Sequence, residues 1–441
     1  MRDMAKIVTV NYAIPMYQKD RICAVTFKEN AYEVIVPKED AVPGKKLVFI
    51  EADSILPVKP EWEFLRKRCF RESLNGFLIR PMVMGKKDNM GMEGERVRSW
   101  GLAVTPASIG LDEKISAGTD VTEQLEIRKY EPPDDASPTN GQNSSKYPYL
   151  IRLFSRSRFA PLRIIAKTWM DLYGNKGGFP TDLISKSDET TIQNCKEVLD
   201  IFKDELVYTT AKMEGQSVTA VLELKRSLWF KRLKFYVCSR NMAYKQENGN
   251  VFWTFAKEHD LKNKFIRFYE RTGLLPIIQA EQCGPGIQSN IYNFNKIRWF
   301  VYEAKTVNPI SGEVKQLPLD EMIEMANEFG LDVVQVLDSD IKLSDVMPDV
   351  NTAVQYADKA FYRIHNDKTN DQRIEEFNFG WNVQIPKNLK LWKDYMQHEG
   401  VVVRSMKCDK DHGIGCSFKV KNIAYAEMDL SKMAKIVKEK L

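Results

Sequence analysis

The chain has 441 residues, of which 43% are hydrophobic and 11% aromatic; this is enough to fill the cores of two domains and excludes global disorder. Its 65 basic and 60 acidic residues leave a net charge of +5, which is too small an excess to indicate a polyanion partner by itself. No apolar run approaches the roughly 20 residues that cross a bilayer, and the first residues lack a secretory signal pattern, so we expect a soluble intracellular protein with no membrane partner.

Four short runs rich in β-branched and aromatic residues recur in the first part of the chain, at residues 21–27, 32–37, 46–56 and 76–84. Turn-forming Pro-Gly and Asn-Gly pairs separate these runs, and few helical patterns lie between them. Several short strands with few helices predict a small β-barrel or sandwich.

One break in composition covers residues 134–146, where Pro, Gly, Asn and Ser replace the apolar pattern on either side. We interpret this stretch as a linker or an exposed loop between domains. The expected organisation is an N-terminal domain over residues 1–133, a linker over 134–147 and a larger domain over 148–441.

Strands and helices mix in the larger domain. Residues 189–206 carry apolar side chains at helical spacing behind a capping Ser-Asp pair, which predicts a helix. Residues 319–330 predict a second helix that ends at a glycine. The expected strands are residues 218–224, 234–240, 297–304, 399–405 and 417–422.

Lys212 lies in the tetrapeptide KMEG, between an apolar run and a strand-like run. A lysine in this position can attack a phosphorus atom if neighbouring cations keep part of it deprotonated, and Gly215 lets a ligand approach the backbone closely. Because K-x-E-G is frequent on surface loops, the tetrapeptide alone favours a solvated lysine beside a turn.

Two patterns near the C-terminus change that balance. Lys419 and Lys421 in FKVKN are two residues apart, so a strand places both ammonium groups on one face, which suits a triphosphate better than a core. Glu399 leads the run EGVVVR, where it is either an edge residue or, near a phosphate site, a ligand for a divalent cation through oxygen or water.

The most specific stretch covers residues 279–304, QAEQCGPGIQSNIYNFNKIRWFVYEA. The carboxylate of Glu281 is followed by a Gly-Pro-Gly turn and then by an aromatic strand that includes Tyr302. Such a long combination of features is improbable by coincidence.

These segments together resemble the covalent nucleotidyltransferases, specifically the RNA ligases of the phage RNA ligase 2 class. KMEG resembles the nucleophile motif, Ser239-Arg240 a second motif, AEQCGPGIQSN with WFVYEA the third motif and its aromatic extension, EGVVVR the fourth motif, and FKVKN the fifth. The order and the rough spacing agree over most of residues 181–422.

The resemblance implies four catalytic residues. Lys212 would attack the α-phosphate of ATP, and Lys419 and Lys421 would hold phosphate oxygens as charge develops. Glu399, together with Glu214, would be the metal ligand and organise a magnesium ion (or manganese) through its waters.

The resemblance also implies a nucleotide-binding set. Glu281 would bind a ribose hydroxyl, Tyr302 would stack on adenine, and Arg240 would contact phosphate of the nucleotide or the nucleic acid. The chain departs from the family where Glu214 replaces a frequent Asp, where Ala280 replaces a frequent Gly, and where Tyr302 replaces a frequent Phe. A slip in register would assign the stacking to Trp299 or Phe300 instead.

The N-terminal half narrows the resemblance. Residues 20–57, 96–106 and 120–133 resemble the N-terminal OB domain of the RNA ligase typified by Deinococcus radiodurans, and residues 179–194 resemble what precedes the nucleophile in that clade. The implied fold is α+β: an OB-type β-barrel that binds nucleic acid, followed by a nucleotidyltransferase (adenylyltransferase) domain built on mixed, antiparallel sheets.

The implied function is an ATP-dependent RNA ligase for RNA repair, which seals 3′-hydroxyl/5′-phosphate nicks through a lysyl-AMP and an adenylylated 5′ end. Its substrate would be nicked duplex nucleic acid with RNA at the 3′-hydroxyl end, and its cofactors ATP and Mg²⁺ (or Mn²⁺). We expect a monomer in the cytoplasm or nucleus, and a viral origin stays open.

Two classes of rival remain open. A DNA ligase or an mRNA-capping guanylyltransferase would use the same lysine chemistry, although the early OB-like part and the third motif favour RNA ligases. A non-catalytic nucleic-acid-binding protein would have lost the activity, against which the presence of Lys212, Glu399, Lys419 and Lys421 argues.

The seven cysteines form no framework of spacings, which fits a reducing compartment. Cys408, His412 and Cys416 stand close in the sequence, but three soft ligands at this spacing match no common zinc pattern. We therefore predict a loop that joins two strands at this point.

Overall fold

The computed structural model describes residues 3–16, 19–84, 97–130, 154, 159, 161–163, 176–181, 183–184, 189–226, 231–244, 250–288, 290, 294–363, 399–407 and 417–422. These residues form two compact units. Unit 1 takes Met1–Pro133 with Thr190–Lys203 and Ser344–Val354, and unit 2 takes Asp134–Glu189, Asp204–Leu343 and Gln355–Leu441. The expected linker over 134–147 lies outside the described residues.

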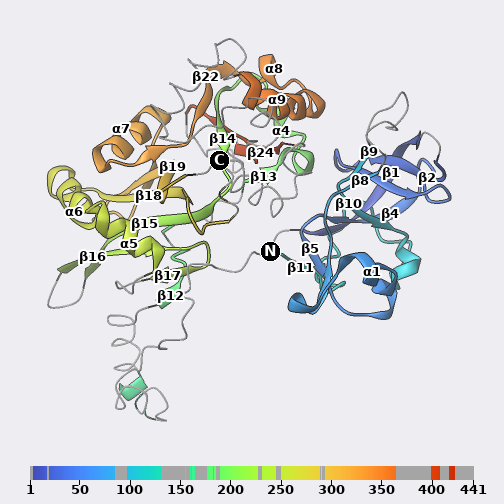
Figure 1. Cartoon of the computed structure of the whole chain (residues 1–441), viewed down its shortest axis with the longest axis horizontal. Coiled ribbons are helices and arrows are strands. Elements are labelled where there is room, and N and C mark those ends of the chain that lie inside the picture. Colours follow the sequence, from blue (N-terminus) through green and yellow to red (C-terminus); the bar gives the residue numbers. More distant parts are fainter. Residues whose placement is uncertain are drawn as a thin grey trace. The chain divides into compact units, whose positions relative to one another are not determined.

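Unit 1 is built around an antiparallel five-stranded sheet (Figure 1). The backbone N–H of Trp100 donates to the carbonyl oxygen of Glu33 over 3.0 Å, which links the two ends of the sheet and nearly closes it. The predicted small N-terminal β-barrel is therefore confirmed. In sheet order, the strands are β10 (Gly101–Val104), β4 (Lys46–Glu51), β1 (Ala5–Met16), β2 (Lys19–Phe27) and β3 (Glu33–Pro37).

The apolar run at the start of β1 is buried on both faces. Ile7 and its cross-strand partner Val48 belong to a core with Trp62, whereas Val8 and its partner Leu47 belong to the core inside the barrel. Because successive side chains of a strand point to opposite faces, one strand supplies both cores.

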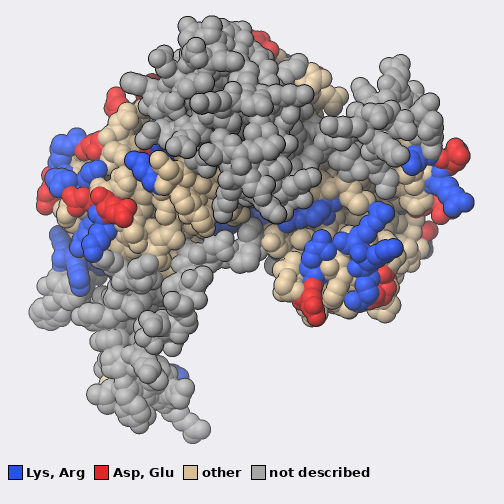
Figure 2. All heavy atoms as spheres, in the orientation of Figure 1, with Lys and Arg blue, Asp and Glu red and all other residues tan. Residues whose placement is uncertain are grey.

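A second, smaller sheet and several short helices complete this part of unit 1. Lys and Arg side chains gather over the region that carries α1 (Figure 2). The sheet has the order β11 (Arg128–Lys129), β5 (Ser54–Leu56), β7 (Gly76–Leu78), β6 (Phe70–Arg71); the hairpin is β8 (Met82–Met84) with β9 (Val97–Ser99); and the helices are η1 (Pro60–Leu65), α1 (Arg66–Cys69), η2 (Glu72–Leu74) and η4 (Pro106–Ile109).

The helix predicted over residues 189–206 is wrong. This stretch contains β13 (Thr190–Thr191), η5 (Ile192–Asn194) and the short α4 (Val198–Ile201), and β14 begins at its end. The carbonyl oxygen of Gln193 accepts from the backbone N–H of Ala31 over 3.1 Å, so it is not available to a helix. Tertiary contacts thus override the helical spacing of the apolar residues.

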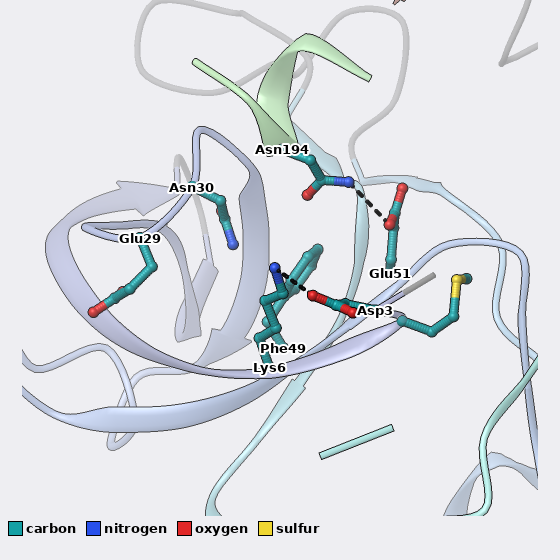
Figure 3. A pocket seen from close by; sticks show the side chains of 8 residues that line it. Asp3, Lys6, Glu29, Asn30, Phe49, Glu51 and Asn194 are labelled. Atoms are coloured by element: carbon teal, nitrogen blue, oxygen red, sulfur yellow. Dashed lines mark hydrogen bonds and ion pairs between the residues drawn. The ribbon is translucent and has the colours of Figure 1, made fainter. Parts of the chain in front are cut away.

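The same segment closes a small cavity in unit 1 (Figure 3). On one side the amide nitrogen of Asn194 donates to Glu51 over 3.1 Å, and on the other Lys6 pairs with Asp3 over 3.0 Å. The cavity holds about 20 Å³, which is room for a single water molecule and too small for a nucleotide.

Unit 2 contains a large, mainly antiparallel sheet. Helices α5, α6 and α7 pack on it through Phe252, Phe265 and Phe329, which are fully buried. The strands in sheet order are β12 (Lys176–Gly178), β17 (Met242–Tyr244), β16 (Lys231–Cys238), β15 (Gln216–Arg226), β18 (Leu275–Cys283), β19 (Arg298–Val307) and β20 (Val314–Gln316), with β21 (Asp332–Val333) parallel to β19; the helices are α5 (Val251–Glu258), α6 (Leu261–Thr272) and α7 (Leu319–Phe329).

The helix predicted over residues 319–330 is confirmed: α7 ends at Gly330, whose φ of 66° is the left-handed conformation that favours glycine at a helix C-terminus. A second sheet of unit 2 carries the strands that the motifs predicted near the C-terminus. Its strands from unit 2 run in the order β24 (Ser417–Lys421), β23 (Gly400–Ser405), β14 (Leu206–Lys212) and β22 (Val336–Lys342). Helices α8 (Leu343–Val346) and α9 (Val350–Arg363) follow β22.

The predicted fold class, a β-barrel followed by a larger unit of mixed α and β structure on antiparallel sheets, is therefore confirmed. Among the described residues, no helix is long and apolar enough to cross a membrane.

Candidate active site

Lys212 is the last residue of β14, and it faces the start of β23. The backbone N–H of Glu399 donates to the carbonyl oxygen of Lys212 over 3.0 Å, and a carboxylate oxygen of Glu399 lies 2.5 Å from the Lys212 ammonium. Both side chains are only about a quarter exposed, at 27% and 28%. The lysine is thus held at the end of a central strand instead of moving freely in solvent.

Gly400 makes this junction possible. A Cβ atom at this position would lie 2.1 Å from the carbonyl oxygen of Val420, so only glycine lets β23 approach β24 so closely. Because β23 begins at Gly400, the alternation of its side chains does not extend to Glu399, which turns toward Lys212.

Strand β24 adds two cations beside the lysine. Lys421 is paired with Gly400, and Lys419 with Val402, while Lys212 is paired with Gly400 from the other side. Directly opposed residues of an antiparallel pair point to the same face, so Lys212, Lys419 and Lys421 share one face of the sheet. Three ammonium groups on one face form a field that suits a polyphosphate.

Glu281 lies on β18, opposite Ser217 of β15. Burial raises its pKa from the usual 4.5 to about 8, and the charge of Glu399 adds to the rise, while the cations of Lys212 and Arg240 oppose it. These charged groups therefore lie near one another, and at neutral pH the carboxyl group of Glu281 is mainly protonated. A protonated carboxyl can both donate and accept a hydrogen bond, as a hydroxyl partner requires.

The turn after Lys212 packs tightly on β18. A Cβ atom on Gly215 would lie 2.6 Å from the carbonyl oxygen of Gln282 and 2.8 Å from the sulfur of Cys283. The thiol of Cys283 donates to the carbonyl oxygen of Glu214 over 3.3 Å, and burial raises the pKa of this thiol well above its usual range. Cys283 thus fixes the turn after Lys212 as a neutral thiol, a contact that nothing in the sequence indicated.

Arg240 follows β16 in a tight turn. The backbone N–H of Ser239 donates to the carbonyl oxygen of Met242 over 2.9 Å, and the backbone N–H of Met242 donates to the hydroxyl of Ser239 over 3.3 Å. The turn carries Arg240 close enough to Glu281 to lower the pKa of that carboxyl group.

Tyr302 projects from β19 toward β15. Its hydroxyl and that of Ser217 are 3.1 Å apart, within hydrogen-bond distance. Trp299 and Phe300, the two alternatives for a stacking ring, are fully buried, whereas Tyr302 is partly exposed. Tyr302 is therefore the ring of the three that a ligand can reach.

Arg404 on β23 supports this ring. Its guanidinium carbon lies 5.8 Å from the centre of the Tyr302 ring, and its side chain is 7% exposed. Burial by itself would lower the pKa of Arg404, but the nearby charge of Glu189, 3.0 Å away, and the neighbouring phenol of Tyr208 raise it. The cation is therefore held permanently charged beside the ring.

Two family comparisons bear on this arrangement. Residues 4–93 match an OB-fold domain family, and residues 205–421 match the RNA ligase family. The second match covers every strand that carries the residues described above.

Residues 205–421 are therefore an RNA ligase domain.

The prediction of an RNA ligase enzyme is therefore confirmed at the level of the family, and the OB-fold domain at the N-terminus of the ligase is confirmed as well. No curated protein matches the ligase in sequence.

Solved structures of similar fold come from Naegleria gruberi. The RNA ligase of that organism with PPi is 20% identical, with a TM-score of 0.63, and the match covers 97% of this chain and 98% of that chain. A Lys-to-Ala variant with ATP and Mn is 20% identical, with a TM-score of 0.64 and coverage of 97% of both chains. A Lys-to-Met variant with AMP and Mn is 19% identical, with a TM-score of 0.64 and coverage of 97% and 98%. These likenesses show that the ligase has the same fold.

The residues present fit a divalent cation whose remaining ligands come from substrate phosphates and water. Within the described parts of the ligase, no group of three or more His, Cys, Asp and Glu residues forms a cage for a metal. Glu399 and Glu214 both act on the charge of Glu281, so the two carboxylates lie in one neighbourhood. Magnesium usually takes one or two carboxylates together with substrate phosphates and waters, which such a pair provides.

One predicted feature lies outside this description. Cys408, His412 and Cys416, which we expected in a loop between β23 and β24, are outside the described residues.

Proposed function

We propose that the ligase seals 3′-hydroxyl/5′-phosphate nicks, that Lys212 carries the nucleotide, and that the preferred substrate has RNA at the 3′-hydroxyl end. The observation that carries the proposal is the ion pair of 2.5 Å between Lys212 and Glu399, on the sheet face that also bears Lys419 and Lys421. A lysine that is paired with a carboxylate and lies beside two further lysines is well placed to attack a triphosphate, because the cations attract the phosphates.

The first step forms a bond between the Lys212 nitrogen and the α-phosphorus of ATP, and it breaks the bond from that phosphorus to pyrophosphate. The ammonium group must first lose a proton, and the ion pair with Glu399 stabilises the form that cannot attack. Binding of the triphosphate and a cation would engage Glu399 and the two lysines of β24, which would release the amine.

The next two steps transfer the adenylyl group and then displace it. A 5′-phosphate oxygen takes the adenylyl group from Lys212, and a 3′-hydroxyl oxygen then attacks that phosphate and releases AMP. Lys419 and Lys421 would stabilise the charge that develops on the phosphate oxygens in each transfer.

The nucleotide would be placed by three groups. Tyr302 would stack on adenine with its supported ring, Glu281 would bind a ribose hydroxyl, and Arg240 would contact phosphate. A magnesium or manganese ion held by Glu399 and Glu214 would supply charge neutralisation at the phosphates. A structure of the Naegleria gruberi RNA ligase holds ATP and Mn, which supports ATP and a divalent cation as the ligands proposed here.

The substrate and clade are part of the proposal. We propose a ligase of the Deinococcus radiodurans type within the RNA ligase 2 class, acting as a monomer on a nick with an RNA 3′ end. The OB-fold domain over residues 4–93 supports the part of this proposal that concerns the domain order. We propose domains over residues 1–133 and 148–441. Unit 1, however, also includes residues from both sides of β14, so a cut at residue 133 would remove part of its packing.

The test is covalent labelling. The protein is incubated with magnesium and either ATP or GTP labelled at the α-phosphate, then denatured. Label from ATP that survives denaturation and is absent from Lys212→Ala supports the ligase, and label from GTP instead indicates capping. Absence of label from both nucleotides would contradict a covalent mechanism and favour a non-catalytic binding protein.

The second test addresses the substrate. Sealing rates are compared on nicked duplexes whose 3′-hydroxyl strand ends in RNA or in DNA, with the 5′-phosphate strand held constant. Faster sealing of the RNA end supports the RNA preference. Equal or faster sealing of the all-DNA nick would assign the protein to DNA joining.

A further inference from the structure

Five cationic side chains crowd one short part of unit 1. Three of them form α1, one follows in β6 and one comes from β11, and all five are exposed. The stretch from η1 to η2 holds three carboxylates, Glu61, Glu63 and Glu72, so five positive and three negative charges leave +2. We call this set the α1 surface; it consists of Arg66, Lys67, Arg68, Arg71 and Arg128.

Backbone contacts hold the arginines of the α1 surface together. Arg71 donates to the carbonyl oxygens of Arg68, over 3.2 Å, and of Phe70, over 2.9 Å, and Arg128 donates to that of Leu74 over 3.4 Å. Each contact uses one nitrogen of a guanidinium group, which has five N–H donors in all. The groups are thus positioned with donors left for an external acceptor.

Most of these cations form no ion pair with an Asp or Glu side chain in the described part of the protein. Among the described residues, Lys67, Arg68, Arg71 and Arg128 form no ion pair, and only Arg66 does, with Glu63 at 2.5 Å. Their neighbours behave differently, because Lys59 pairs with Glu126 at 2.9 Å and Arg80 pairs with Asp53 at 2.8 Å. Positive side chains so close together repel one another, and a bound anion would relieve this repulsion. The α1 surface therefore indicates an anionic partner.

An exposed aromatic ring lies next to this cluster. Phe64 in η1 is 64% exposed, two residues before Arg66. An exposed ring beside arginines is what proteins use to stack an unpaired base while cations hold the phosphates.

The face on which OB barrels usually bind strands has no such charge. It is formed by the second and third strands. In unit 1, the exposed end of β2 has Lys19, Asp20 and Arg21, and the turn after β3 has residues 38–40, Lys-Glu-Asp. Three cations and three carboxylates cancel there, so electrostatics favour the α1 surface instead.

We propose that the α1 surface binds the phosphate backbone of the polynucleotide substrate and that Phe64 stacks on a base where the strand is unpaired. The inference rests on the proposed function for the nature of the substrate. Four of the five cations are arginines, whose planar guanidinium groups match phosphate oxygens in a bidentate way. Together with the exposed ring, this favours a nucleic acid over an acidic protein.

The test compares two double variants of the full-length protein with matched charge. Lys67→Ala/Arg68→Ala removes two cations of the α1 surface that make no described ion pair, and Arg21→Ala/Lys38→Ala removes the same charge from the β2–β3 face. Fluorescence anisotropy measures binding to labelled single-stranded RNA and to a labelled nicked duplex. We expect roughly tenfold weaker binding for the first variant only. For that variant, the slope of log K against log salt concentration should also become shallower by about 0.7 to 0.9 for each lost phosphate contact.

Phe64→Ala separates the two forms of the ligand. A loss of about fivefold or more for single-stranded RNA, with none for the duplex, would show that the surface takes an unpaired strand. If Phe64→Ala changes neither while the double variant weakens the duplex, the surface takes paired backbone.

Two results would overturn the inference: equal affinities of the two double variants for both probes, or displacement of RNA by polyglutamate at the same charge concentration as by unlabelled RNA. Formation of lysyl-AMP from ATP is measured in parallel and should be unchanged in all three variants. If the wild-type protein forms no lysyl-AMP, the proposed ligase function fails, while the binding comparison still decides the α1 surface.

Discussion

The guanidinium group of Arg404 lies 5.8 Å from the centre of the Tyr302 ring, although the two residues are 102 positions apart. Arg404 is anchored by Glu189, which also accepts a hydrogen bond from Ser417. A buried, paired cation thus supports the ring that we assign to adenine, and it connects strands β23, β24 and β19 around the proposed nucleotide site.

We expect Arg404→Met to weaken ATP use more than it slows the chemistry. Loss of the cation leaves the Glu189 carboxylate with only the Ser417 hydroxyl and no positive charge beside it, which should cost about 3 to 5 kcal/mol of unfolding free energy. It also frees the Tyr302 ring, so the KM for ATP in lysyl-AMP formation should rise while kcat changes less. Thermal unfolding and the ATP dependence of labelling measure the two effects.

The matched control is Arg404→Met/Glu189→Gln, which removes the charge of both partners. This variant should recover part of the lost stability but not the KM for ATP. If stability and KM recover together, Arg404 acts only on the packing of the sheet.

Lys212→Arg separates folding from chemistry at the nucleophile. An arginine keeps a positive charge beside Glu399, so the ion pair and the melting temperature should change little. The guanidinium group has no available lone pair, so the variant should take up no label from ATP. Residual labelling of more than a trace in Lys212→Arg would place the covalent bond on another residue.

Glu281 should make stability depend on pH. Its pKa is about 8 in the folded chain against 4.5 ordinarily, because burial disfavours its charge. Between these values the folded state keeps a proton that the unfolded state has released, so the unfolding free energy falls as pH rises from about 4.5 to about 8, by at most ~1.4 kcal/mol per pH unit.

Thermal unfolding between pH 5 and pH 9, with EDTA and without ATP, tests this expectation. Glu281→Gln has no titrating group at this position, so its melting temperature should fall less steeply over the same range. Parallel curves for the two proteins would mean that Glu281 ionises normally.

Much of the catalytic strand arrangement could be predicted from local pattern. The spacing of two between Lys419 and Lys421 placed both on one face, and the pairing of β24 with β23 agrees with that. The glycine that ends α7 also sufficed to place the helix end at residue 330. These features depend on neighbours in the sequence, which periodicity reports directly.

Long-range relationships escaped the sequence. Arg404 and Glu189 are 215 residues apart, and no local pattern indicates that a strand arginine is buried with an acid from another segment. The helical spacing in residues 189–206 misled for the same reason, because contacts such as Gln193 with Ala31 decide its backbone. The raised pKa of Glu281 likewise depends on burial, which composition does not reveal.

Gly400→Ala should disturb the active site through the backbone. Its Cβ atom would lie 2.1 Å from the carbonyl oxygen of Val420, and a backbone atom can yield only if β23 and β24 separate. We expect a loss of about 1 to 3 kcal/mol in unfolding free energy. Because Gly400 pairs with both Lys212 and Lys421, the separation should also displace the two ammonium groups from each other and reduce lysyl-AMP formation by about tenfold or more.

Gly312→Ala is the matched control, since a Cβ atom there would meet nothing within 4 Å and only the backbone conformation, with φ at 77°, opposes it. That variant should lose about 1 kcal/mol and keep its full labelling rate. Denaturant unfolding and the rate of labelling from ATP, measured on both variants, decide the matter. If Gly400→Ala loses no more activity than Gly312→Ala, close contact between β23 and β24 is not required to hold the lysines around the triphosphate.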